Sequence, residues 1–140
     1  MVYIDTSALV PLFIREAKSD ALVAWLEESE ERVAISDWGL VEFASAAAIK
    51  VRTGHITQRL ATQAFGRAVA FARRHCKVAT PGRDEFSRAA EIVGVPALNL
   101  RAGDALHLAI AESLGARGML CFDEVMAEAA KSLGIRVVGV

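Results

Sequence analysis

The sequence has little of what several large protein classes require. Its 140 residues include only two cysteines, Cys76 and Cys121, with neither CxxC spacing nor a paired framework, so a disulfide scaffold is excluded and a reduced, cytoplasmic setting is expected. The longest apolar runs, such as Ala8–Phe13 and Ala44–Ile49, are far shorter than the ~18 residues that suggest a membrane span. The opening residues Met1–Asp5 lack the basic stretch of an export signal, so export is not expected.

Basic charge is also not in excess. The chain has 16 Lys and Arg against 17 Asp and Glu, a formal net charge of −1. General nucleic-acid binders are usually basic, so any contact with nucleic acid must be local or mediated by a metal. No GxGxxG or GxxxxGK[ST] motif follows a strand, which argues against the common nucleotide-binding folds. No repeat or linker interrupts the chain, and residues 1–140 are expected to form one domain.

Short apolar segments alternate with helical patterns along the chain. We expect five strands, at Val2–Ile4, Arg32–Ser36, Lys77–Ala79, Gly118–Phe122 and Arg136–Val140. Helices are expected at Ser7–Phe13, Lys18–Ser29, Asp37–Thr53, Thr57 to about His75, Arg83–Val93, Gly103–Leu114 and Glu124–Leu133, with a loop at Val95–Arg101. This alternation predicts an α/β fold: a single three-layer domain with a parallel sheet of about five strands and helices on both faces.

Four carboxylates stand out in this pattern, namely Asp5, Glu42, Asp104 and Asp123. Each lies where a strand gives way to a helix, or early in the helix that follows. In an open parallel sheet these junctions share the carboxyl edge, where such folds bind ligands. Like charges gathered there repel one another, which favours a hard divalent cation between them. Mg²⁺ suits the site, because one or two carboxylates hold it together with water and substrate phosphate. The pattern therefore predicts metal-assisted phosphoryl chemistry.

Helix capping is the structural alternative for the aspartates, because short polar side chains accept hydrogen bonds from first-turn N–H groups. In the run Asp5-Thr6-Ser7, three consecutive residues are able to cap. We expect Thr6 or Ser7 to cap the following helix and Asp5 to face the cleft. Asp104 follows Gly103 at the start of an expected helix, which is a capping position.

The other two acids have different alternatives. Glu42 is the only acid in an otherwise apolar helical stretch, so it either functions in a site or forms an ion pair with an arginine. Asp123 is followed by Glu124, and we expect one of the two to cap the next helix while the other faces the cleft. His107 shares a helix face with Asp104 and is expected to be a packed polar residue near the site, able to orient a carboxylate or a water, rather than a catalytic group.

Along its whole length the sequence resembles PIN domains, and among them the VapC-type toxins of prokaryotic toxin–antitoxin pairs. Four segments carry the resemblance through their order and spacing: Tyr3–Leu9, Val41–Phe43, Asp104–Ala109, and Phe122–Asp123 ahead of Leu133–Ile135. The resemblance implies a parallel sheet with helices on both sides and an acidic quartet that serves both catalysis and metal binding. In this sequence the quartet falls on Asp5, Glu42, Asp104 and Asp123.

The resemblance also implies a biochemical function. Such proteins are Mg²⁺- or Mn²⁺-dependent endoribonucleases, commonly homodimers, that a small antitoxin encoded alongside neutralises. Ser7 matches a hydroxyl residue often found beside the quartet, with Thr6 as a second supporting hydroxyl. Cys121 departs from the family, which often has Thr or Ser two residues before the last acid, so Glu124 remains an alternative to Asp123.

Three rival functions stay open at this point. An aspartate-nucleophile phosphatase of the haloacid-dehalogenase type generally has a second Asp two residues after the first, and Ser7 occupies that place. A receiver-type signalling module needs an Asp at the end of the third strand, and Lys77–Thr80 contains none. A catalytically inactive PIN-like module that only binds another protein is compatible with the sequence, because the acids would then serve as helix caps.

Overall fold

A five-stranded parallel sheet lies at the centre of the molecule. The computed structural model describes residues 1–140 and orders the strands β3-β2-β1-β4-β5, with every neighbouring pair parallel. The strands are β1 (Val2–Ile4), β2 (Val33–Ser36), β3 (Cys76–Ala79), β4 (Gly118–Leu120) and β5 (Arg136–Val137). The predicted sheet is confirmed, although β4 and β5 end earlier than expected. After β4, the Phe122 N–H donates to the Ser7 hydroxyl at 2.7 Å, so the chain turns toward α1 at this point.

Seven α-helices surround the sheet. They are α1 (Thr6–Leu9), α2 (Ser19–Glu28), α3 (Asp37–Arg52), α4 (Gln58–His75), α5 (Arg83–Val93), α6 (Ala102–Ser113) and α7 (Glu124–Ser132). None is long and apolar enough to span a bilayer. The first predicted helix is divided, because Pro11 lacks an N–H and the chain continues as a 3₁₀ turn at Val10–Leu12. The loop expected at Val95–Arg101 contains a second 3₁₀ turn, Pro96–Leu98.

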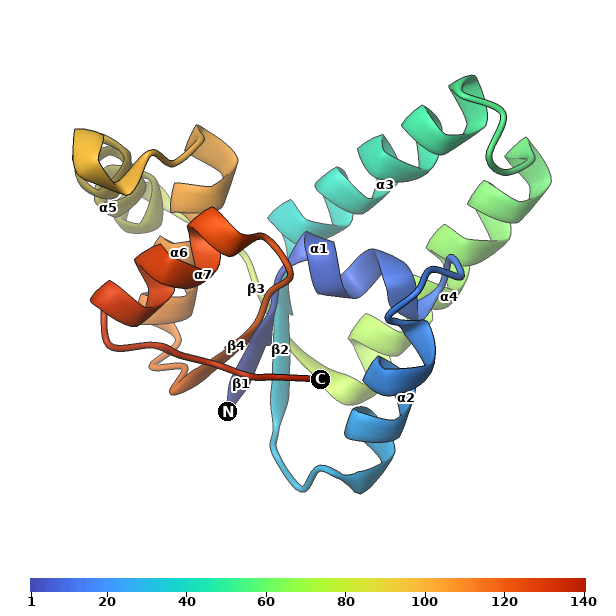
Figure 1. Ribbon diagram of the computed structural model, residues 1–140, viewed down its shortest axis with the longest axis horizontal. Coiled ribbons are helices and arrows are strands. Elements are labelled where there is room, and N and C mark those ends of the chain that lie inside the picture. The colour runs from blue at the N-terminus through green and yellow to red at the C-terminus, as the bar shows by residue number, and fades with distance from the viewer.

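The helices form two layers that follow from the path of the chain. Helices α1 to α4 connect β1, β2 and β3 and lie on one side of the sheet, whereas α5 to α7 connect β3, β4 and β5 and lie on the other (Figure 1). The strands after β1 are added on one side of it as far as β3 and on its other side from β4 onward, so the strand order reverses at β1, which pairs with both β2 and β4. In parallel α/β sheets, the crevice at such a switch point is where ligands bind.

Strand alternation divides the core in the same way. Val2 and Ile4 of β1 pack in the cluster beneath α1 to α4, whereas Tyr3, between them, packs on the opposite side against α6 and α7. Successive strand residues point to opposite faces, so each apolar strand supplies both layers. The two halves of the core thereby hold the carboxyl ends of β1, β2 and β4 next to one another.

Helix α6 reaches the same edge from the other direction. It precedes β4 in the chain and returns to the start of that strand, so its first turn lies at the carboxyl ends of the strands. Asp104 therefore joins the other acids although a loop, and not a strand, precedes its helix. Asp104 does lie early in a helix, but that helix follows a loop, so the expectation that a strand precedes it is wrong.

Candidate active site

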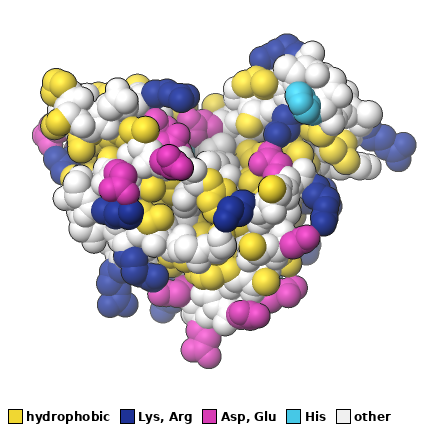
Figure 2. Space-filling view, in the orientation of Figure 1, with side chains coloured by type: hydrophobic (Ala, Val, Ile, Leu, Met, Phe, Trp, Pro, Cys, Tyr) yellow, Lys and Arg dark blue, Asp and Glu magenta, His cyan; other side chains and the backbone are white.

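All four predicted acids line one cavity of about 400 Å³ at the carboxyl edge of the sheet. The cavity is also lined by Thr6, Ser7, Ser45, Ala46, Ile49, Arg101, His107 and Met126. Figure 2 shows the molecule hollowed between two lobes, with acidic side chains gathered beside the hollow. The chain thus brings together carboxylates that are up to 118 positions apart, from Asp5 to Asp123. Repulsion among them must be balanced by positive charge or by protons.

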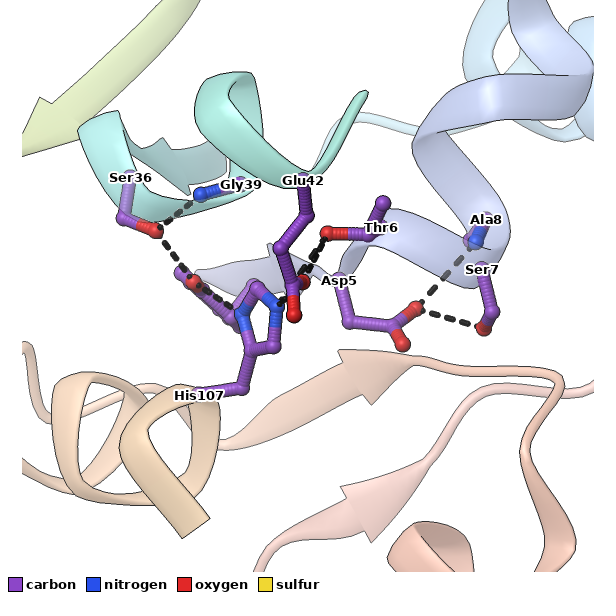
Figure 3. Close-up of polar contacts among 9 residues, drawn as sticks. Asp5, Thr6, Ser7, Ala8, Ser36, Gly39, Glu42 and His107 are labelled. Atoms are coloured by element: carbon purple, nitrogen blue, oxygen red, sulfur yellow. Dashed lines mark hydrogen bonds and ion pairs between the residues drawn. The ribbon is translucent and has the colours of Figure 1, made fainter. Parts of the chain in front are cut away.

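Asp5 both caps a helix and faces the cavity. Its Oδ1 accepts hydrogen bonds from the Ser7 hydroxyl at 2.8 Å and from the Ala8 N–H at 3.2 Å, whereas Oδ2 makes no hydrogen bond (Figure 3). The expectation that Thr6 or Ser7 caps the helix is wrong, because α1 begins at Thr6 and leaves Asp5 at the capping position. Asp5 is only 1 % exposed, and this burial raises the pKa of its carboxyl group.

Glu42 projects from the second turn of α3, which Ser36 caps by accepting the Gly39 N–H. Its Oε2 accepts the Thr6 hydroxyl and lies next to Nε2 of His107, each at 2.6 Å. No arginine pairs with it. Burial alone would raise the pKa of Glu42, but the contacts with His107 and Thr6 outweigh this effect and hold the pKa below its usual range.

Asp104 lies in the first turn of α6 and not at its cap. The helix begins at Ala102, and Asp104 Oδ2 accepts the backbone N–H of Arg101 at 3.3 Å. The alternative that Asp104 serves as the cap is therefore wrong, because it contacts the capping residue Arg101 from the third helical position. Burial raises the pKa of Asp104, and the negative charges of Asp123 and Glu42 raise it further. Asp104 therefore lies close enough to Asp123 and Glu42, in the lining of the same cavity, for their charges to repel.

Asp123 combines the two roles that were expected for it and Glu124 separately. Its Oδ1 caps α7 by accepting the Met126 N–H at 2.8 Å, while the residue still lines the cavity. Glu124 is exposed and is not part of the lining. Cys121 donates to the backbone carbonyl of Asp123 at 3.3 Å. Ser7 holds this segment in place, because its oxygen accepts the Phe122 N–H and its hydroxyl donates to Asp5.

Sequence reasoning missed two residues beneath the cavity, Tyr3 and Ser36. The Tyr3 hydroxyl lies 2.7 Å from Ser36 Oγ and 2.7 Å from His107 Nδ1 (Figure 3). A signal was present in the sequence, because a tyrosine in a buried strand needs a partner for its hydroxyl group. The expectation that His107 is a packed polar residue near the site is confirmed, since it is 1 % exposed and contacts Glu42.

The donor chemistry of the cavity fits a hard divalent cation. Its lining offers carboxylate and hydroxyl oxygens, and Arg101 is its only Lys or Arg side chain against four acids. The free Oδ2 of Asp5 adds a buried acceptor that no cationic side chain neutralises. No three His, Cys, Asp or Glu side chains are arranged to bind one ion directly. Mg²⁺ tolerates such a site, because it usually keeps several waters and takes only one or two protein carboxylates.

Comparison with known families agrees with this architecture. The family model described as "PIN domain" matches residues 2–132, nearly the whole chain. The chain belongs to the PIN-domain family. This PIN domain is 34% identical over 139 residues to Ribonuclease VapC46 of Mycobacterium tuberculosis, and the match covers 98% of this chain and 95% of that protein.

Solved structures with the same fold include two whose names refer to VapC or VapBC proteins. The crystal structure of VapC20 from Mycobacterium tuberculosis, described as a Sarcin-Ricin loop cleaving toxin, superposes on this PIN domain with a TM-score of 0.73. The two chains are 19% identical, and the match covers 92% of this chain and 95% of VapC20. VapBC-1 from nontypeable Haemophilus influenzae gives a TM-score of 0.67 at 12% identity, with 99% and 97% covered. At these identities the likeness shows the fold alone.

Proposed function

We propose that this PIN domain is a divalent-metal-dependent endoribonuclease, the toxin of a VapBC-type toxin–antitoxin pair. One observation carries the proposal: four carboxylates from distant parts of the chain line one cavity, and a single arginine accompanies them. The naming of a relative as Ribonuclease VapC46, at 34% identity over almost the full length, supports RNA as the substrate. A small antitoxin and a second copy of the chain are the expected partners, in keeping with the VapC resemblance.

Each acid receives a role that matches its surroundings. Asp5 and Asp104 would hold the principal Mg²⁺ or Mn²⁺, because both have carboxyl groups whose pKa is raised by burial and which a cation would stabilise in the charged form. Glu42 and Asp123 would complete the shell or hold a second ion. When bound, the metal would lower the pKa of a water molecule, and its positive charge would stabilise the negative charge that develops on the phosphate.

The remaining groups bind, orient and accept protons. Arg101 lies at the rim of the cavity, where its guanidinium group is placed to bind a phosphate of the RNA backbone. Asp123 is only half-buried and has one oxygen, Oδ2, without a hydrogen bond, which suits it to accept a proton from an attacking water. Thr6 and Ser7 fix Glu42 and Asp5 through their hydroxyl groups. No side chain needs to act as a nucleophile.

The test is cleavage of RNA by the purified protein. A mixture of tRNA, mRNA and rRNA that includes the sarcin-ricin loop is incubated with Mg²⁺ or Mn²⁺, with and without a chelator. We expect cleavage that the chelator stops and that Asp5→Asn and Asp104→Asn both lack. Undiminished cleavage by either variant, or in the chelator, contradicts the assignment. A folded protein that neither binds metal nor cleaves RNA would instead be an inactive binding module, and a phosphate group trapped on Asp5 would indicate a phosphatase.

A further inference from the structure

A chain of buried hydrogen bonds runs beneath the cavity and ends on Glu42. Its links join Glu42 Oε2 to His107 Nε2 at 2.6 Å, His107 Nδ1 to the Tyr3 hydroxyl at 2.7 Å, and that hydroxyl to Ser36 Oγ at 2.7 Å (Figure 3). Tyr3 and Ser36 are fully buried, and His107 is almost so. Breaking any link would leave a polar group unsatisfied in the core, so the chain keeps one arrangement.

The contact with Glu42 sets the direction of the first bond in this chain. A carboxylate only accepts, so Nε2 of His107 carries the hydrogen between them. The Tyr3 hydroxyl lies between Nδ1 of His107 and Ser36 Oγ, and the Ser36 oxygen accepts the Gly39 N–H at 3.1 Å. Both ring nitrogens of His107 are therefore held by hydrogen bonds, which fixes the ring in the core.

These hydrogen bonds determine the orientation of the Glu42 carboxylate. Oε2 is held by two groups, Thr6 and His107, whereas Oε1 accepts no hydrogen bond. A free glutamate side chain loses conformational entropy when it is ordered. In this site the contacts to Thr6 in α1 and His107 in α6 have already fixed the side chain, which leaves Oε1 free for a further ligand.

We propose that His107, held in place by Tyr3 and Ser36, is the positioning residue that orients Glu42 toward the metal. The inference rests on the proposed function in one respect, because it takes Glu42 as part of the metal site. His107 itself touches neither metal nor RNA in this account. Outer-shell partners of this kind change metal affinity or activity ~10–100-fold when they are removed.

The experiment measures the metal-free protein first. Nitrogen NMR of the histidine rings in the wild type should show a hydrogen on Nε2 of His107. Tyr3→Phe removes only the hydroxyl that contacts Nδ1, so it should shift the Nδ1 resonance and leave the hydrogen on Nε2. A wild-type ring with its hydrogen on Nδ1 alone, or an Nδ1 resonance that Tyr3→Phe leaves unchanged, would overturn the proposed chain.

Titration with Mn²⁺ alone then tests the consequence. We expect His107→Met, which fills the space without donating, to weaken Mn²⁺ binding ~10–100-fold. His107→Gln places an amide N–H near the position of Nε2 and should recover much of the lost affinity. Leu108→Ala is the matched control: it removes a fully buried neighbour in α6, destabilises the fold and should leave Mn²⁺ affinity unchanged.

These outcomes separate the two proposals. The positioning role is overturned if folded His107→Met binds Mn²⁺ with wild-type affinity, or if Leu108→Ala loses as much Mn²⁺ affinity as His107→Met does. Either result leaves the nuclease proposal intact. A wild-type protein that binds no Mn²⁺ and cleaves no RNA defeats the proposed function. In that case the NMR result on the metal-free protein still decides whether the hydrogen-bonded chain exists.

Discussion

Gly103 offers the sharpest test of how tightly the site is built. A Cβ at this position in α6 would lie 2.8 Å from Glu42 Oε1 and 3.3 Å from Cζ2 of Trp38. The first distance is below normal contact, so one group must move. The Glu42 carboxylate is the more flexible group, but two hydrogen bonds at 2.6 Å, from Thr6 and from His107, hold its other oxygen. Gly103→Ala therefore has two opposing effects: alanine favours the helix, but its Cβ clashes with the Glu42 carboxylate.

The magnitudes indicate which effect dominates. Replacing glycine by alanine in a helix stabilises by up to ~1 kcal/mol. A hydrogen bond to a charged group contributes about 1.5–3 kcal/mol, so losing one of the two bonds outweighs that gain. We expect a net destabilisation of about 0.5–2 kcal/mol, or a fall in Tm of roughly 2–8 °C for a chain of this size. RNA cleavage should fall more than tenfold, because Glu42 is displaced from the cavity.

Gly66→Ala is the matched control for this substitution. Gly66 lies in the middle of α4, is exposed, and has no heavy atom within 4 Å of the position of a Cβ. The control should raise stability by about 0.5–1 kcal/mol and leave RNA cleavage unchanged. Thermal unfolding without divalent cations and single-turnover cleavage measure both variants. A Gly103→Ala protein that is as stable as Gly66→Ala and fully active would refute the reasoning.

Three further outcomes concern the acids and their supports. The pKa of Asp5 is raised in the fold, so metal-free protein should lose stability as pH rises from about 4 through that raised value. Asp5→Asn should not show this loss, and its free energy of unfolding in urea at neutral pH should exceed that of the wild type. If the stability of both proteins changes with pH in the same way, burial of Asp5 does not destabilise the fold. Ser7→Ala deprives the Phe122 N–H of its acceptor and Asp5 of a donor, so it should cost about 1–3 kcal/mol, and an unchanged urea midpoint would be inconsistent with that role. Mg²⁺ at a hundredfold excess over its dissociation constant should stabilise the wild type by ~2.7 kcal/mol in calorimetry, and an equal gain in Asp5→Asn would argue against a site at Asp5.

The fold was predictable because its signals are local and repeated. Short apolar segments alternating with helical patterns specify a parallel sheet, and all five of its strands begin within one residue of the predicted start. Strand ends were less predictable, since they depend on contacts from elsewhere. The end of β4, for example, is determined by the hydroxyl of Ser7, 115 residues earlier.

The meeting of the four acids was also predictable, because parallel topology gathers strand ends at one edge. The detailed roles were not. The sequence cannot reveal that Asp5 caps α1, since that depends on whether the helix begins one residue earlier or later. Nor does it reveal the partner of Glu42, because His107 is 65 residues away in the sequence and meets it only in the folded chain. The connection from Tyr3 to His107 spans 104 residues and depends on which face of β1 the tyrosine occupies.

Anomalous diffraction can show whether the distant carboxylates of this cavity share a hard cation. Crystals grown or soaked with Mn²⁺ and measured near the manganese absorption edge would locate the ion without any assumption about activity. We expect a peak in the cavity between Asp5 and Asp104, absent from Asp5→Asn crystals. A fully occupied Mn²⁺ site elsewhere, with no peak near these two carboxylates, would contradict this expectation.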